Sequence, residues 1–240
     1  MAIEVHAVIE RAATGGDEWQ RWRARRVTGD DAAAVPDIPS QDGAGGFVGP
    51  GGRVSPGATG EALCHLVVVG LRDSGPAAVA ADWLEDARTP AGAWLDPPSE
   101  VPGELDAAAG GRVWATAAAV CGLLAAGRDP GRRALDLLRG EADHDGRVTG
   151  GAYPTFAAAG AYWLAEGPKT EMAEWALRWA READDDWEPW DRASALTFWA
   201  AAGVPPEHAS VETFVAGLAA PEDDLALSLL AVELLAFFGA

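Results

Sequence analysis

Paired aspartates come near an acid motif at two places in the chain, and such carboxylates can hold a metal or donate a proton. Asp223 and Asp224 open the last apolar stretch, and three aspartates precede Trp187 in READDDWEPWD, residues 181–191. An aspartic acid donates a proton to a substrate only where its surroundings keep it protonated, and aromatic rings can stabilise the resulting cation. The helices that carry each pair therefore decide which of them could act as an acid.

Glycines mark the ends of the long apolar stretches. They are Gly75, Gly127, Gly167, Gly203 and Gly239, and a proline follows soon after each of the first four. Glycine accepts the left-handed conformation that ends a helix, and proline cannot continue its hydrogen bonds. The intervals of 52, 40, 36 and 36 residues between these glycines indicate an array of helical hairpins.

Each hairpin has two unlike halves. The first helix is apolar on every face, as in residues 112–127, and the second is amphipathic, as in residues 130–141. A helix without a polar face is buried, whereas one with a charged stripe lies at the surface. We therefore expect an inner and an outer layer. The opening pair follows the same order, with an inner helix before an outer helix at 17–27, and the last inner helix has no partner.

The predicted fold is all-α, a single α/α toroid of about six helical-hairpin repeats that lacks its last outer helix. A closed ring is favoured over an open superhelix because the ends of an open array need polar faces, and the last helix is strongly apolar. The repeats of the single domain 1–240 are expected at 2–47, 48–94, 111–148, 152–187, 191–220 and 221–240.

A turn recurs between each outer helix and the next inner helix. It appears as QDGAGGF (41–47), RTPAGAW (88–94), DHDGRV (143–148) and DDDW (184–187). The first two resemble the glutamine–glycine–aromatic turn of squalene-hopene cyclases and related terpenoid cyclases, although Arg88 replaces the glutamine in the second. The chain thus resembles the squalene-cyclase and protein-prenyltransferase superfamily. That resemblance implies a toroid that binds isoprenoid chains in an aromatic-lined central cavity.

The resemblance also assigns an acid. Class II terpenoid cyclases use an Asp-x-Asp-Asp motif, and PEDDLALSLL (221–230) keeps the paired aspartates but has Pro221 in place of the first one. Asp223 would be the catalytic acid and Asp224 its neighbour, at the start of an inner helix. The alternative is that they cap the helix, because carboxylates favour helix N-termini. The aspartates of 184–186 fall in the turn, where we expect them to be solvated.

Further candidates lie at corresponding starts of inner helices. Aromatic rings there could line an apolar pocket or belong to the core, and a carboxylate could meet a ligand or cap its helix. The candidate ligand-binding residues are Glu61, Trp114, Tyr153, Phe156, Trp190 and Asp191.

Composition excludes several classes of partner. The net charge of −19 argues against nucleic acid and anionic membranes as partners, because a protein needs basic groups to bind their negative charge. No stretch approaches the roughly 20 apolar residues of a membrane span, and the start does not resemble a signal peptide, so a cytoplasmic protein is expected. Cys64 and Cys121 are predicted to be buried thiols. No metal or cofactor is expected, because neither a metal-ligand spacing nor a phosphate-binding glycine loop is present.

The leading functional hypothesis is a terpenoid-cyclase-like or prenyltransferase-like protein that binds an isoprenoid or other apolar ligand in a central cavity. Acid-initiated cyclisation at Asp223 is its catalytic form, and whether the protein is an enzyme stays open. One alternative is a non-catalytic toroid acting as a binding module, a partner subunit or a homo-oligomer. Another is a carbohydrate-active toroid using Glu61, Asp191 and Asp223 with tryptophans that stack on sugars.

Overall fold

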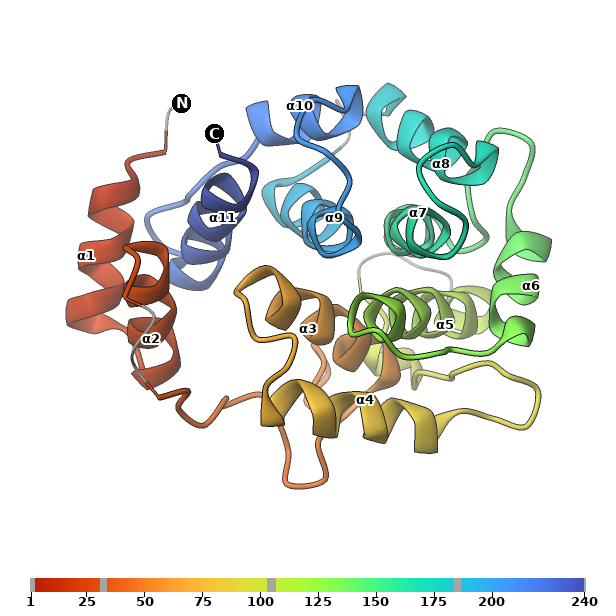
Figure 1. Ribbon diagram of the computed structural model, residues 1–240, viewed down its shortest axis with the longest axis horizontal. Helices are drawn as coiled ribbons and strands as arrows, with labels where there is room; N and C mark the ends of the chain where they lie inside the picture. The colour runs from red at the N-terminus through yellow and green to blue at the C-terminus, as the bar shows by residue number, and fades with distance from the viewer. Residues whose placement is uncertain (1–2, 31–33, 103–106, 184–186, 240) are drawn as a thin grey trace.

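The computed structural model describes residues 3–30, 34–102, 107–183 and 187–239, and these residues form helices without a β-strand (Figure 1). The all-α prediction is therefore confirmed. The helices are α1 (Val5–Gly15), α2 (Glu18–Val27), α3 (Pro56–Val68), α4 (Gly75–Ala87), α5 (Ala107–Ala125), α6 (Arg132–Glu141), α7 (Ala152–Glu166), α8 (Glu171–Glu182), α9 (Pro189–Ala202), α10 (Ala209–Ala216) and α11 (Leu225–Phe238), with a 3₁₀ turn η1 (Pro98–Glu100). None of these helices is both long and apolar enough to cross a bilayer.

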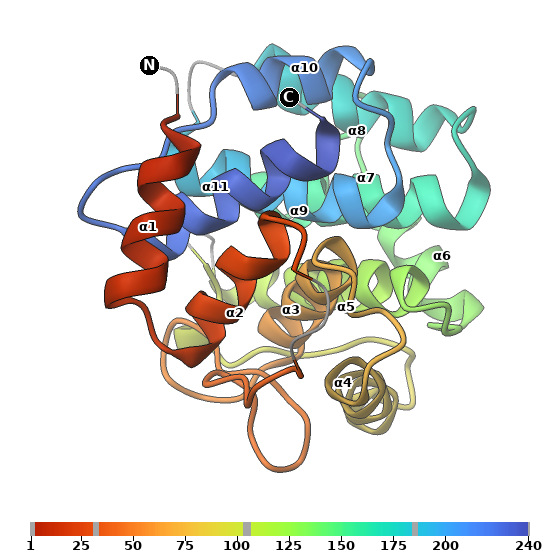
Figure 2. The same ribbon diagram turned by 60° about the vertical axis from the view of Figure 1, so that its left-hand side comes forward.

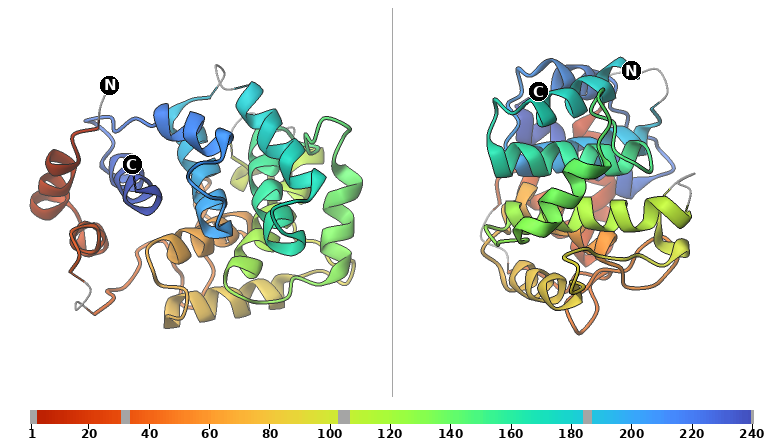
Figure 3. Two further views of the ribbon diagram at one scale, coloured as in Figure 1. Left: turned by 45° about the horizontal axis from the view of Figure 1, so that its top comes forward. Right: turned by 90° about the vertical axis from the view of Figure 1, so that its right-hand side faces the viewer.

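Consecutive helices pack as hairpins in two layers. In the inner layer α3 contacts α5, α5 contacts α7, α7 contacts α9 and α9 contacts α11, while α4, α6, α8 and α10 lie outside them (Figure 1). Both α1 and α2 pack against α11, so the two ends of the array meet. Figure 3 (left) shows the red N-terminal helices beside the dark blue C-terminal helix. This packing is consistent with an α/α toroid.

The first hairpin is inverted relative to the prediction. Helix α1 buries only Val8 and Ala12, whereas α2 buries two stacked tryptophans and Arg23. The predicted order of an inner helix followed by an outer one is therefore wrong for this pair. The reason lies at the far end of the chain, because Arg23 pairs with Glu233 of α11, and this contact holds α2 against the ring.

Four of the five predicted glycine stops are correct. Gly127, Gly167, Gly203 and Gly239 follow helices with φ between 71° and 87°, in the left-handed region. The predicted stop at Gly75 is wrong, since α3 is already followed by Gly70, with φ 78°, and Gly75 begins α4 behind the N-cap Ser74. Both glycines precede Pro76, so the glycine–proline rule identified the correct loop and chose the wrong residue.

The recurring turn ties neighbouring helices together. Gln41 Nε2 donates to Gly45 O (3.0 Å) and to Pro76 O at the start of α4 (2.9 Å). In the next repeat Arg88 Nη1 donates to Pro130 O (2.8 Å), just before α6. Arg88 therefore bridges to the next outer helix in the second turn, as Gln41 does in the first.

The end of each turn also positions the following inner helix. The backbone amide of Phe47 donates to Thr59 Oγ1 (2.8 Å), that of Trp94 to Thr116 Oγ1 (3.1 Å) and that of Val148 to Thr155 Oγ1 (3.0 Å). Thr59 and Thr155 lie near the starts of α3 and α7, and Thr116 lies midway along α5. These bonds hold the turns against the three inner helices that carry candidate ligand-binding residues.

The fourth turn contains the acidic patch, and Asp184, Asp185 and Asp186 lie outside the described residues. Trp187 donates its indole N–H to Ala180 O (2.8 Å), much as Trp94 donates to Leu84 O (2.7 Å) in the second turn. Trp187 thus takes the structural place predicted for the turn aromatic.

Small residues allow the inner helices to touch. A Cβ atom on Gly60 would overlap the backbone of Ala118, and one on Gly122 would lie 2.6 Å from Gly60 O. Residues 154–162 of α7 and 193–202 of α9 are all buried, and α3 contacts α9 directly. The four helices α3, α5, α7 and α9 therefore pack as a core. Cys64 and Cys121 are buried free thiols there, as predicted.

Candidate functional site

Four predicted ligand-binding residues, one from each of the inner helices α3, α5, α7 and α9, come together. The rings of Trp114 (α5) and Tyr153 (α7) lie 5.9 Å apart, edge to face. The Asp191 carboxylate at the start of α9 lies close enough to Tyr153 to raise the pKa of its hydroxyl, and Glu61 Oε1 on α3 accepts from Ser194 Oγ on α9 (2.6 Å). Glu61, Trp114, Tyr153 and Asp191 are called the mouth cluster below.

Burial shapes the electrostatics of the mouth cluster. It raises the pKa of Glu61 against the opposing hydrogen bond from Ser194. It also raises the pKa of Tyr153, and the neighbouring carboxylates Asp191 and Glu61 raise that pKa further. A charge on Tyr153 or on Glu61 is thus disfavoured, because few water molecules reach them.

A further carboxyl group, Asp96, lies beside the cluster and was missed by the sequence analysis. Its Oδ1 accepts from the Gly57 amide at the start of α3 (3.2 Å). Burial, aided by nearby Glu100, raises the pKa of Asp96 to about 7, while the Gly57 amide and the Ser55 and Trp114 side chains oppose this rise. Burial thus favours the neutral form of Asp96. Its position after the turn gave no sign of this burial.

Phe156 belongs to the core. Its side chain is fully buried, and its ring packs on those of Trp187 (5.3 Å), Phe214 (5.9 Å) and Trp199 (6.1 Å). Its ring centre also lies 6.1 Å from that of Tyr153, so it packs against one member of the mouth cluster. No surface of Phe156 is left for a ligand.

The predicted acid pair lies on an exposed rim. Asp224 Oδ1 accepts from Leu227 N (2.9 Å) and caps α11, and its Oδ2 accepts from Trp190 Nε1 (3.1 Å). Trp190 is 46 % exposed, and Asp223 is exposed. Asp224 therefore has the capping role that the sequence left as the alternative.

A cavity of about 250 Å³ lies at the opposite end of α3, between α2, α3 and α11. Figure 2 shows these three helices next to one another. Most of its wall is aliphatic or aromatic, with one arginine and one glutamate. The lining residues are Arg26, Val27, Val68, Val69, Gly70, Glu233, Ala236 and Phe237.

The glutamate in this wall belongs to a buried ion cluster. Arg23 Nε donates to Glu233 Oε1 (2.7 Å), Arg23 Nη2 to Oε2 (2.5 Å), and His65 Nε2 lies 2.8 Å from Oε2. Burial alone would raise the pKa of Glu233, but Arg23 and His65 outweigh it and hold that pKa at about 2. Glu233 is therefore ionised at every physiological pH and joins α2, α3 and α11.

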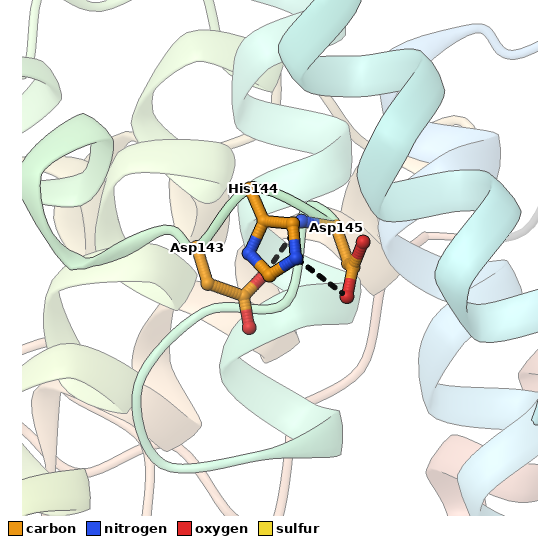
Figure 4. Close-up of side chains that lie close together, drawn as sticks. All are labelled: Asp143, His144 and Asp145. Atoms are coloured by element: carbon orange, nitrogen blue, oxygen red, sulfur yellow. Dashed lines mark hydrogen bonds and ion pairs between the residues drawn. The ribbon is translucent and has the colours of Figure 1, made fainter.

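An exposed trio on the third turn has the right residue types for a metal. Asp143, His144 and Asp145 place ligand atoms within 4.8 Å of one another (Figure 4). However, Asp143 Oδ1 already accepts from the amides of Asp145 (2.9 Å) and Arg147 (3.0 Å). These bonds shape the turn, and all three side chains are exposed. The turn accounts for the cluster without a metal.

Comparison with known proteins does not place the chain in a family. No family model matches the sequence, and no curated protein matches it.

Proposed function

We propose that the protein binds an apolar ligand, with a short isoprenoid as the first candidate, in the cavity between α2, α3 and α11. The observation that carries this proposal is the aliphatic wall formed by Val27, Val68, Val69 and Ala236. Ligand pockets are concave, mostly apolar and contain a few polar groups that orient the ligand. The cavity has this composition, and the resemblance of the turns to those of terpenoid cyclases supports an isoprenoid.

The volume limits the length of the ligand. An apolar cavity of roughly 150 Å³ holds benzene, so about 250 Å³ has room for roughly ten carbon atoms. This favours a geranyl chain over the much longer squalene.

Charge in the wall suggests how such a ligand would lie. Arg26 lies at the cavity, with its guanidinium 5.5 Å from the Trp22 ring centre, and α2 contains four arginines in a chain of net charge −19. A phosphate or hydroxyl group at the ligand's end would therefore point towards α2. The binding form of the hypothesis is favoured over cyclisation at Asp223, because that residue is exposed at the far rim.

Filling the cavity is expected to abolish binding. In Ala236→Trp the indole would occupy the space of the ligand, so the affinity for geraniol or geranyl diphosphate should fall at least tenfold. Isothermal titration calorimetry with each compound measures this effect. Ala226→Trp is the matched control, since Ala226 is an exposed residue of the same helix that does not line the cavity. Equal affinities in the two variants, or no binding by the unmodified protein, would contradict the proposal.

A further inference from the structure

Arginines gather around a second cavity, of about 450 Å³, between the end of α4 and the start of α6. Arg88 enters it from the second turn, and Arg132 and Arg133 enter it from the first turn of α6. All three side chains are exposed to solvent. Three of the 18 basic residues thus line one cavity of a protein whose net charge is −19, and this cavity is a basic site on an acidic molecule.

The protein itself neutralises little of this positive charge. Glu85, the carboxylate in the cavity lining, is paired with Arg128 (3.1 Å). Within the described residues, neither Arg88 nor Arg133 has a carboxylate oxygen within 4.0 Å of its guanidinium group. Two guanidinium groups of the lining therefore keep their charge available for a ligand.

Backbone carbonyls hold these two guanidinium groups in place across the cavity. Arg88 Nη1 donates to Pro130 O, just before α6 (2.8 Å), and Arg133 Nη1 donates to Pro90 O of the second turn (3.1 Å). Each wall thus receives an arginine from the opposite wall. A guanidinium group has five N–H donors, so each arginine keeps further donors after these bonds are made.

Glycines make room for the two arginines and leave the start of α6 open. A Cβ atom on Gly131 would lie 2.9 Å from Arg88 Nη1, and one on Gly92 would lie 2.8 Å from Arg133 Cβ. Gly131 is also the N-cap residue of α6, and no side chain caps this helix. The first amides of a helix have no partner within it and attract anions. The start of α6 therefore adds backbone donors to the same cavity.

We propose that this cavity binds the phosphate group of a small phosphorylated molecule. Planar guanidinium groups donate paired hydrogen bonds to phosphate oxygens, and Arg88 and Arg133 would hold one phosphate from opposite walls. A volume of about 450 Å³ exceeds what one phosphate group fills, so the organic part of an ester also has room. The site lies between outer helices and does not depend on the function proposed for the cavity between α2, α3 and α11.

The first turn of the array suggests the variant that tests this site. Gln41 takes the place of Arg88 there and donates to Pro76 O, so Arg88→Gln should keep the bridge to α6 and remove the charge. Isothermal titration calorimetry should show saturable binding of glycerol 3-phosphate to the unmodified protein, with a Kd of about 1 mM or lower. Arg88→Gln and Arg133→Gln should each weaken this binding about tenfold or more, because each removes charge-assisted hydrogen bonds.

Controls separate this site from the net charge and from the apolar cavity. Arg178→Gln removes one charge from a side chain of α8 that is 49 % exposed and should leave the Kd unchanged. Ala236→Trp should also leave it unchanged, and Arg88→Gln should not affect geraniol binding. The absence of saturable binding, or an equal loss in Arg178→Gln and Arg88→Gln, overturns the proposal. Tighter binding of inorganic phosphate than of glycerol 3-phosphate overturns the assignment of a phosphate ester.

Discussion

Replacing Glu233 with glutamine is expected to lower the free energy of unfolding by about 3–5 kcal/mol, as for other buried ion pairs that lose one partner. The amide preserves the side chain's shape but not its charge. Arg23 is 6 % exposed and would remain charged with no carboxylate beside it, since a guanidinium cannot release its proton. Urea denaturation of the two proteins measures the difference.

An exposed ion pair provides the matched control. Arg112 Nη2 lies 2.6 Å from Glu141 Oε1, but its side chain is 48 % exposed. Exposed pairs contribute less than about 1 kcal/mol because water solvates the separated charges, so Glu141→Gln should change stability by no more than this. Similar losses in both variants would show that Glu233 acts through something other than its buried charge.

The same cluster should make the protein sensitive to acid. The pKa of Glu233 is lowered from 4.5 to about 2 in the folded protein. A depressed pKa stabilises the fold above the unfolded value, and this stabilisation is lost as the pH falls from about 4.5 to about 2. Between pH 6 and pH 3 the loss amounts to about 2 kcal/mol. Urea midpoints at both pH values should show it in the unmodified protein. In Glu233→Gln the part of the acid-induced loss of stability that comes from Glu233 should be absent, and the part that comes from other carboxylates should remain.

The helical array was predictable because its signals are local. Glycine endings such as Gly127 and Gly203, and the contrast between apolar and amphipathic helices, can be recognised within a few turns of chain. Placing the inner helices in register also brought the starts of α3, α5, α7 and α9 together. For this reason Glu61, Trp114, Tyr153 and Asp191 were named together from the sequence and lie together in the structure.

The features that escaped prediction depend on contacts between distant segments. Arg23 and Glu233 are 210 residues apart, and only their pairing shows that α2 faces inwards. Asp96 resembles many loop aspartates until Gly57 and Trp114 enclose it. Composition alone cannot show which carboxylates lose their water, so Asp223 and Asp224 appeared to be stronger acid candidates than Asp96.

Phe156→Ala is expected to lower the free energy of unfolding by about 3–5 kcal/mol, the usual cost of removing a large aromatic side chain from a core. Phe156 is completely buried among Trp187, Trp199 and Phe214. Its removal would leave a cavity that these rings cannot fill without breaking their own contacts, such as the 3.2 Å bond from Trp199 Nε1 to the Phe156 carbonyl. Urea denaturation without ligand measures the change.

The same substitution at Phe237 separates a core ring from one at a cavity wall. Phe237 lines the cavity and is 44 % exposed, so its truncation removes about half as much buried surface and should cost roughly 1 kcal/mol. If Phe156 lined a ligand pocket, Phe156→Ala would cost little in the empty protein and would weaken binding instead. A large loss of stability for Phe156→Ala, with geraniol affinity weakened only in Phe237→Ala, would place the ligand between α2, α3 and α11 and assign Phe156 to the core.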